Sequence, residues 1–259
     1  MKEHRFHEAE LAFKNLLRIQ QKQKKSLPDA LMSEYYNFIG VCLHAQGKSG
    51  EAIEYYQKGL TSSPKMAWKQ HVKLLSNTAM AQSALNKKDA ALQSMTKALS
   101  LARKHRLPAQ DKGVLLNNYG QLLAANSKLS KAKLVLIEAV QTRENLAQNT
   151  DRNLISPLNN LALVCIQLNE LDEAEGHCKR AISIQEREDD DEALVFASWN
   201  NLATIYVRKK KFDEAEKSFE NALEIAKMCF GPHSEQALKV SENLSLIYNA
   251  NGKFSATKQ

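Results

Sequence analysis

The side chains best suited to catalysis or metal binding are scattered through this sequence of 259 residues. Its seven histidines form no H-x-x-x-H pair, and none stands at zinc-ligand spacing from a cysteine; they are His4, His7, His44, His71, His105, His177 and His233. The sequence also has no glycine-rich phosphate loop and no G-x-S-x-G motif. These observations predict a protein that is not an enzyme, with no catalytic residue, no metal site and no cofactor.

The cysteines and the N-terminal residues indicate the cellular compartment of the protein. The four cysteines form no C-x-x-C pair, so we expect reduced thiols packed in the core; they are Cys42, Cys165, Cys178 and Cys229. Residues 1–13 are charged and lack the apolar core of a secretory signal. No apolar run approaches the ~18 residues that span a bilayer. We therefore expect a cytoplasmic protein without membrane insertion.

A net charge of +7 raises the hypothesis of a nucleic-acid partner. The basic run 208–211, however, falls where a turn between two helices is expected, and the other basic runs fall in linkers. No aromatic residues interleave with these runs to stack bases. The carboxylates follow the outer faces of amphipathic helices. Solvated turns and faces account for these charges, so nucleic acid is not the expected partner.

An internal repeat organises almost the whole chain. A small residue is followed twelve residues later by an alanine, and about seven residues after that by another small residue. The first members stand 39, 41, 42 and 41 residues apart, and the triplets are Gly40/Ala52/Gly59, Ala79/Ala91/Ala98, Gly120/Ala132/Ala139, Ala162/Ala174/Ala181 and Ala203/Ala215/Ala222. Small residues let two helices approach closely. A repeat of this length is typical of a solenoid of stacked helix pairs, which presents a long groove.

The repeat resembles the tetratricopeptide repeat, two antiparallel helices joined by a tight turn. The best match is Tyr36-x-x-Ile39-Gly40-x-x-Leu43, followed by Gly47, Ala52, Tyr56, Gly59 and Pro64. The resemblance implies an all-α, right-handed superhelical solenoid with five full helix-turn-helix units. We expect these units at about 33–62, 71–104, 112–147, 154–187 and 192–229, within a single domain over residues 1–259.

Both ends of this array are expected to carry half units. Residues 5–22 resemble a second helix without its first, and residues 235–250 resemble a closing first helix. A repeat array needs polar outer faces at its ends. The opening half unit therefore suggests either a fragment of a longer array or an edge that another chain covers.

The later units are similar to kinesin light chain repeats of about 42 residues. The matching segments are 158–162 (LNNLA), 199–203 (WNNLA) and 212–216 (FDEAE). This resemblance implies binding of a short peptide along the concave face, which the first helices line. It does not imply a kinesin subunit, because many unrelated proteins use such repeats.

The register of the first helices places a row of residues on that concave face, at positions that share one helix face. The predicted peptide-binding residues are Asn37, Val41, Lys73, Met80, Asn117, Gln121, Asn159, Leu163, Asn200 and Thr204. Carboxamides both donate and accept hydrogen bonds, so a row of them suits a peptide backbone. A second asparagine follows in several units, as in Asn77, Asn118, Asn160, Asn201 and Asn243, and we expect it to bond within or between units.

The partner is expected to be a protein that offers an extended or helical segment with apolar anchors. The lysine clamp that some tetratricopeptide domains use for carboxylate tails of chaperones is absent, since the corresponding pairs are Asn37/Val41, Ser76/Met80 and Asn117/Gln121. We therefore expect a non-enzymatic scaffold. Two alternatives stay open: a peptide-sensing regulatory module of a larger protein, and an assembly factor that contacts RNA or acidic surfaces through basic linkers.

Overall fold

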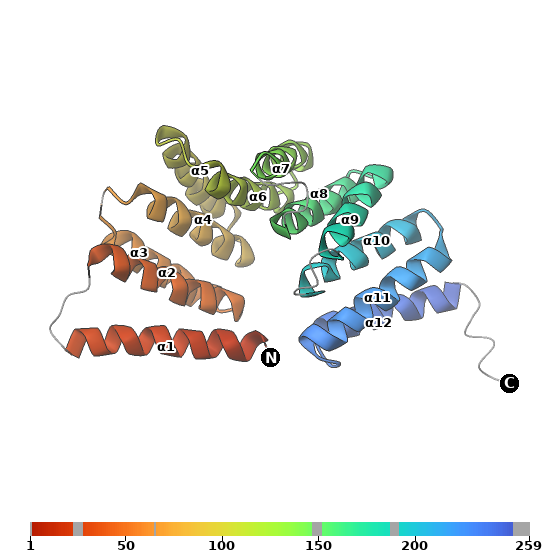
Figure 1. Ribbon diagram of the computed structural model, residues 1–259, viewed down its shortest axis with the longest axis horizontal. Coiled ribbons are helices and arrows are strands. Elements are labelled where there is room, and N and C mark those ends of the chain that lie inside the picture. Colours follow the sequence, from red (N-terminus) through yellow and green to blue (C-terminus); the bar gives the residue numbers. More distant parts are fainter. Residues whose placement is uncertain (1, 23–27, 65, 147–151, 187–191, 251–259) are drawn as a thin grey trace. The chain divides into compact units, whose positions relative to one another are not determined.

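The computed structural model describes residues 2–22, 28–64, 66–146, 152–186 and 192–250, and all of their regular structure is helical (Figure 1). The α-helices are α1 (Lys2–Lys22), α2 (Asp29–Ala45), α3 (Ser49–Ser62), α4 (Trp68–Ala84), α5 (Lys88–Lys104), α6 (Ala109–Ala125), α7 (Leu129–Glu144), α8 (Ile155–Gln167), α9 (Leu171–Gln185), α10 (Phe196–Arg208), α11 (Phe212–Phe230) and α12 (Glu235–Ala250). Short 3-10 turns at Arg152–Leu154 and Glu192–Leu194 precede α8 and α10.

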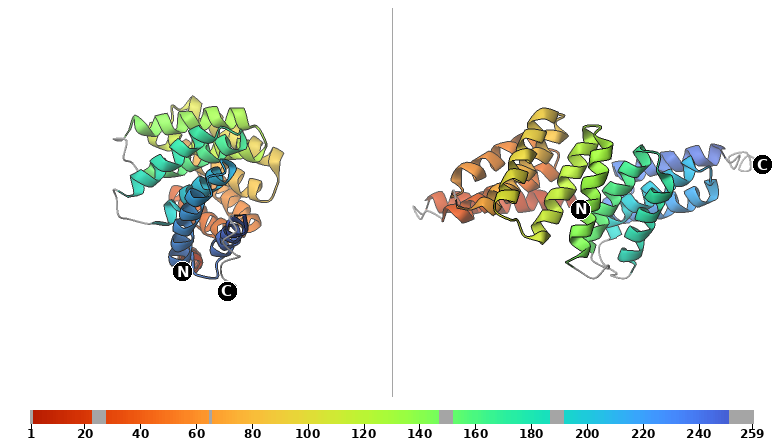
Figure 2. Two further views of the ribbon diagram at one scale, coloured as in Figure 1. Left: turned by 90° about the vertical axis from the view of Figure 1, so that its right-hand side faces the viewer. Right: turned by 90° about the horizontal axis from the view of Figure 1, so that it is seen from above.

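The chain forms two compact units, Met1–Ser127 and Lys128–Gln259. In the first unit α2 pairs with α3 and α4 with α5, while α1 packs on α2 and α3 on α4. In the second unit α8 pairs with α9 and α10 with α11, while α7 packs on α8 and α12 on α11. Figure 2 shows the antiparallel pairs within each unit from two further directions. The border between the units falls at the turn inside the third predicted repeat.

The small residues of the repeat lie where helices meet. Every alanine of the five triplets has an exposed fraction of 0%, and the glycines among them are buried. Large side chains fill the space beside these contacts. One cluster in the first unit gathers Tyr56 with Ile39 and Leu43, and the next gathers Met95 with Leu115 and Leu122. The sequence register therefore marks the helix contacts correctly.

The turn inside each repeat has one backbone conformation. The residue seven positions after the first small residue has a positive φ in all five repeats, at Gly47 (77°), Asn86 (57°), Ser127 (58°), Asn169 (63°) and Lys210 (58°). The next N–H donates back into the preceding helix, as from Lys48 to the Leu43 carbonyl at 2.9 Å. This is the helix ending that glycine favours. Four of the five repeats adopt it without glycine.

Lys210→Gly is expected to raise the free energy of unfolding by about 1 kcal/mol, because a lysine at positive φ is strained and glycine is not. Urea denaturation measures the change. The matched control is Lys211→Gly, since Lys211 has a φ of −94°, where glycine relieves no backbone strain. Equal effects of the two substitutions would contradict the prediction.

The helix ends differ from the expected bounds in a few places. Helices α4 and α6 begin at Trp68 and Ala109, earlier than the predicted starts near 71 and 112, so the connections before them are short. Helix α7 ends at Glu144, before the predicted end of its unit near 147, whereas α11 extends to Phe230, close to the predicted 229. Trp68 joins α4 early because its ring stacks on His105 with centroids 4.9 Å apart. The prediction of one domain over residues 1–259 stays a prediction.

Candidate functional site

A pocket of about 340 Å³ lies on the first helices of the amino-terminal unit. We call it the first-helix pocket. Helices α2, α4 and α6 and the connection before α6 supply its walls. Its lining mixes carboxamides, two lysines, one aspartate, one serine and aliphatic side chains: Asn37, Lys69, Val72, Lys73, Ser76, Asn77, Leu107, Asp111, Val114, Leu115 and Asn118. Two of the predicted peptide-binding residues, Asn37 and Lys73, belong to it.

Hydrogen bonds between successive first helices hold the polar wall of this pocket. Asn77 Nδ2 donates to Asn37 Oδ1 at 2.9 Å, and Asn118 Nδ2 donates to Ser76 Oγ at 3.1 Å. The second asparagine of a repeat (Asn77 or Asn118) thus donates a hydrogen bond to a side chain of the preceding repeat. The acceptor, Asn37 or Ser76, stands at the position just before the second-asparagine position of that repeat. This confirms the structural role predicted for Asn77 and Asn118. It also shows that Asn37 has a structural bond of its own.

The other predicted residues of the first unit lie on the same helices with varied exposure. Val41 is 38% exposed on α2, and Gln121 is exposed on α6. Met80 and Asn117 are half-buried. None of these four lines the first-helix pocket. Their role in binding stays a prediction.

In the second unit the predicted peptide-binding residues differ from one another in burial and in hydrogen bonding. Asn159 is only 7% exposed; its Oδ1 accepts from Ser198 Oγ at 2.7 Å, and its Nδ2 donates to the Leu194 carbonyl at 3.4 Å. Leu163 is 43% exposed on α8. Asn200 and Thr204 are half-buried on α10, and the Thr204 hydroxyl donates to the Asn200 carbonyl. Because Asn159 is buried and bonded on both sides, its replacement is expected to reduce stability.

A second hollow, which the sequence reasoning missed, lies among α9, α10 and α11. Two cavities of about 360 and 440 Å³ share Ile182, Glu186, Trp199 and Asn221, and we call them together the Trp199 groove. The available signal was the spacing of Trp199 and Tyr206, which are seven residues apart and therefore share a helix face. The second helices α9 and α11 supply much of its lining, so the groove differs from the concave row of first-helix residues that the family resemblance implies.

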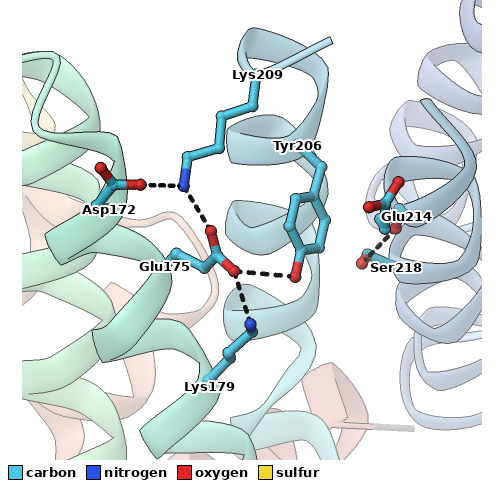
Figure 3. A network of polar contacts seen from close by, with 7 residues as sticks. All are labelled: Asp172, Glu175, Lys179, Tyr206, Lys209, Glu214 and Ser218. Atoms are coloured by element: carbon cyan, nitrogen blue, oxygen red, sulfur yellow. Dashed lines mark hydrogen bonds and ion pairs between the residues drawn. The ribbon is translucent and has the colours of Figure 1, made fainter. Parts of the chain in front are cut away.

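A charged network at the edge of this groove ties the fourth repeat to the fifth (Figure 3). Glu175 accepts hydrogen bonds from Lys209 Nζ and Lys179 Nζ, both at 2.6 Å, and lies 3.3 Å from the Tyr206 hydroxyl. Lys209 also contacts Asp172 at 2.5 Å. Burial alone would raise the pKa of Glu175, but the two lysines outweigh it and lower that pKa to about 2. Lys209 is therefore a structural residue of the basic run, with its side chain 16% exposed.

The depressed pKa of Glu175 makes a prediction about acid stability. The carboxylate stabilises the fold above its ordinary pKa near 4.5, and this contribution is lost as the pH falls from about 4.5 to about 2. Glu175→Gln is expected to lower the free energy of unfolding at pH 7 by about 1–3 kcal/mol, with the difference from wild type shrinking toward pH 2. Urea denaturation at several pH values measures it. Glu220→Gln, on an exposed position of α11, should leave the pH profile unchanged.

The structure also gathers three metal-ligand side chains that the sequence spacing did not indicate. Ligand atoms of Cys165, Glu173 and His177 all lie within 4.8 Å of one another. They come from α8 and α9, so their proximity depends on how this helix pair packs.

All four cysteines are thiols rather than disulfides. No described helix is long and apolar enough to cross a membrane.

The fold and its first-helix surface define a helical-repeat protein built from antiparallel helix pairs. Family models of the tetratricopeptide repeat match residues 33–66 and 72–105, residues 158–188, and residues 194–256. Together these matches cover more than half of the sequence, and the chain belongs to the tetratricopeptide-repeat family. Such repeats indicate a scaffold for protein–protein interaction. No curated protein matches the chain.

Solved structures with the same fold include proteins of several kinds. BtubC (BKLC) from P. vanneervenii is 17% identical with a TM-score of 0.67, over 90% of this chain and 92% of that one. A Rap protein complexed with Competence and Sporulation Factor is 17% identical with a TM-score of 0.68, over 90% and 68%. The putative kinesin light chain repeats of Podosopora anserina are 17% identical with a TM-score of 0.60, over 70% and 87%. These similarities confirm the predicted all-α tetratricopeptide-repeat fold.

Proposed function

We propose that this chain is a non-enzymatic scaffold that binds a peptide segment of a partner protein in the first-helix pocket. The observation that carries the proposal is the composition of the pocket, which places carboxamides, lysines and aliphatic side chains from three consecutive first helices around one hollow. Peptide sites in general combine an apolar anchor position with a few polar groups that fix orientation. We also propose a cytoplasmic location, which the thiol state of the cysteines supports.

The polar wall suits a peptide backbone. The bond from Asn77 Nδ2 to Asn37 Oδ1 occupies one group of each carboxamide. The Asn37 Nδ2 group and the Asn77 Oδ1 atom remain as one donor and one acceptor on two residues that line the pocket. An extended peptide presents backbone N–H and C=O groups whatever its sequence, so a free donor and a free acceptor on the pocket wall suit its main chain.

The apolar wall and the lysines refine the peptide. Val114 is 47% exposed beside the buried Leu115 and offers contact area to an aliphatic or aromatic anchor. Lys69 and Lys73 are one turn apart on α4 and both are exposed. Residues 1–127 carry 19 Lys and Arg against 9 Asp and Glu, whereas residues 128–259 carry 17 against 20. This asymmetry favours a peptide with an acidic residue near its apolar anchor.

The proposal is tested with peptides selected from a random-sequence library for binding to the full chain. Selected peptides are expected to be enriched in an apolar residue next to Asp or Glu, and Lys69→Ala/Lys73→Ala should weaken their binding at least about tenfold. The matched control is Lys87→Ala/Lys88→Ala, which removes two exposed lysines at the start of α5. Affinity is measured by fluorescence anisotropy.

Two outcomes would contradict this assignment. Equal loss in both double variants would show that total charge, and not the pocket, governs binding, as expected for an assembly factor that contacts RNA or acidic surfaces. Peptides that bind both variants like wild type would place the binding site elsewhere.

The regulatory-module alternative differs in requiring an effector domain whose activity responds to the peptide. The Rap protein of similar fold, complexed with Competence and Sporulation Factor, illustrates a factor bound to this fold.

A further inference from the structure

Three side chains with the chemistry of zinc ligands converge at the turn between α8 and α9. Cys165 lies near the end of α8 and is 0% exposed. Glu173 and His177 stand four residues apart, and therefore on one face of α9. The Cys165 sulfur, a Glu173 oxygen and a His177 nitrogen all lie within 4.8 Å of one another. Sulfur, nitrogen and oxygen of these residue types are the ligands that Zn²⁺ takes in proteins.

The His177 ring has one unpartnered nitrogen in this arrangement. Its Nε2 atom is buried and has no hydrogen-bond partner among the described residues. The nearest acidic oxygen, Glu173 Oε1, lies 3.7 Å away, which is too far for a hydrogen bond. A buried nitrogen without a partner is costly, and such atoms in folded proteins usually have a bound water, ion or ligand.

The surroundings hold Glu173 in place and balance charge. Lys133 on α7 donates from Nζ to Glu173 Oε2 and to Glu170 Oε2, each at 2.7 Å. Because Lys133 contacts Oε2, the other oxygen, Oε1, is left facing His177. Two carboxylates, one ammonium and a Cys165 thiolate sum to two negative charges, which a divalent cation neutralises. Lys133 therefore supports the ligand Glu173 as an outer-shell partner.

We propose that Cys165, Glu173 and His177 form a binding site for Zn²⁺ or a similar divalent transition metal, with water as the fourth ligand. Zinc bonds of about 2.0–2.3 Å require the three ligand atoms to approach one another by about 1 Å on metal binding. The Cys165 thiol gives up its proton to solvent as the sulfur binds the cation, and no oxidation or reduction occurs. The bound ion joins α8 to α9 and, through Glu173 and Lys133, to α7.

The metal site is independent of the proposed peptide site, because none of its residues lines the first-helix pocket. Its expected role is to stabilise the fourth repeat. Metal that binds only the folded state stabilises it by mass action, so the melting temperature should rise with metal concentration.

The test uses the full chain without an affinity tag, after treatment with a chelator, and Co²⁺ as a spectroscopic probe for the zinc site. One equivalent of Co²⁺ is expected to give a thiolate-to-metal charge-transfer band in the near ultraviolet, together with visible bands of tetrahedral Co²⁺. Cys165→Ser should abolish the charge-transfer band, and His177→Gln should weaken Zn²⁺ binding at least about tenfold in competition with Co²⁺. The matched controls are Cys229→Ser and His233→Gln, which leave the three ligands intact.

Circular dichroism checks that each variant is folded. If Cys165→Ser does not fold, X-ray absorption of the Zn²⁺-loaded wild type decides, since the proposal requires one sulfur at about 2.3 Å and nitrogen or oxygen near 2.0 Å. Absence of a thiolate band in the wild type would overturn the proposal. So would equal metal affinity in wild type and His177→Gln, or a metal shell without sulfur.

Discussion

Replacing Gly40 by alanine is expected to lower the free energy of unfolding by about 1–3 kcal/mol, despite the higher helix propensity of alanine. A Cβ atom at Gly40 would overlap Cε1 of the Tyr56 ring and lie 2.7 Å from its Cδ1. Tyr56 is 1% exposed and packed in the core, so its ring has little room to retreat. Urea denaturation of the variant measures the loss.

The next repeat indicates a second substitution that should restore the stability lost in Gly40→Ala. In the next repeat Ala79 and Met95 occupy the positions of Gly40 and Tyr56, and both belong to one buried cluster. Gly40→Ala should therefore cost much less in a Tyr56→Met background than in wild type. Gly50→Ala and Gly176→Ala are matched controls, because an added Cβ meets nothing within 4 Å at either position. Both controls should be neutral or stabilising, and equal losses at all three glycines would contradict the packing argument.

Sequence reasoning located the repeat because close helix contacts admit only small side chains. Ala174 and Ala215 were expected at such contacts, and both are 0% exposed. The start of α4 was less predictable, since it depends on the stacking of Trp68 on His105 from the next connection. Such a tertiary contact adds a turn of helix that local patterns do not indicate.

The candidate sites were predicted only in part, because they depend on how neighbouring helices are rotated. The register placed Asn37 and Lys73 on one face, and both line the first-helix pocket. The register did not predict that Asn159 is buried and accepts a hydrogen bond from Ser198. The meeting of Cys165 with His177 across the α8–α9 pair likewise has no linear motif.

Val114→Asp is expected to weaken binding of a selected acidic peptide at least about tenfold. The substitution removes the exposed part of the apolar wall and sets a negative charge where the anchor is expected. Because Val114 is 47% exposed, unfolding should change by under about 1 kcal/mol. Leu134→Asp is the matched control, since Leu134 is 68% exposed on α7 and lines no described cavity. Loss of affinity in both variants, or in neither, would count against the pocket.

The most direct measurement of the central claim is a methyl NMR titration of the full chain with a selected peptide. The proposed function predicts that the methyl signals of Val72, Val114 and Leu115 shift on binding, because these side chains line the first-helix pocket. The methyl groups around the Trp199 groove, at Ile182, Val195 and Ile225, should stay unchanged. Shifts confined to the Trp199 groove, with Val114 and its neighbours unchanged, would contradict the proposed site.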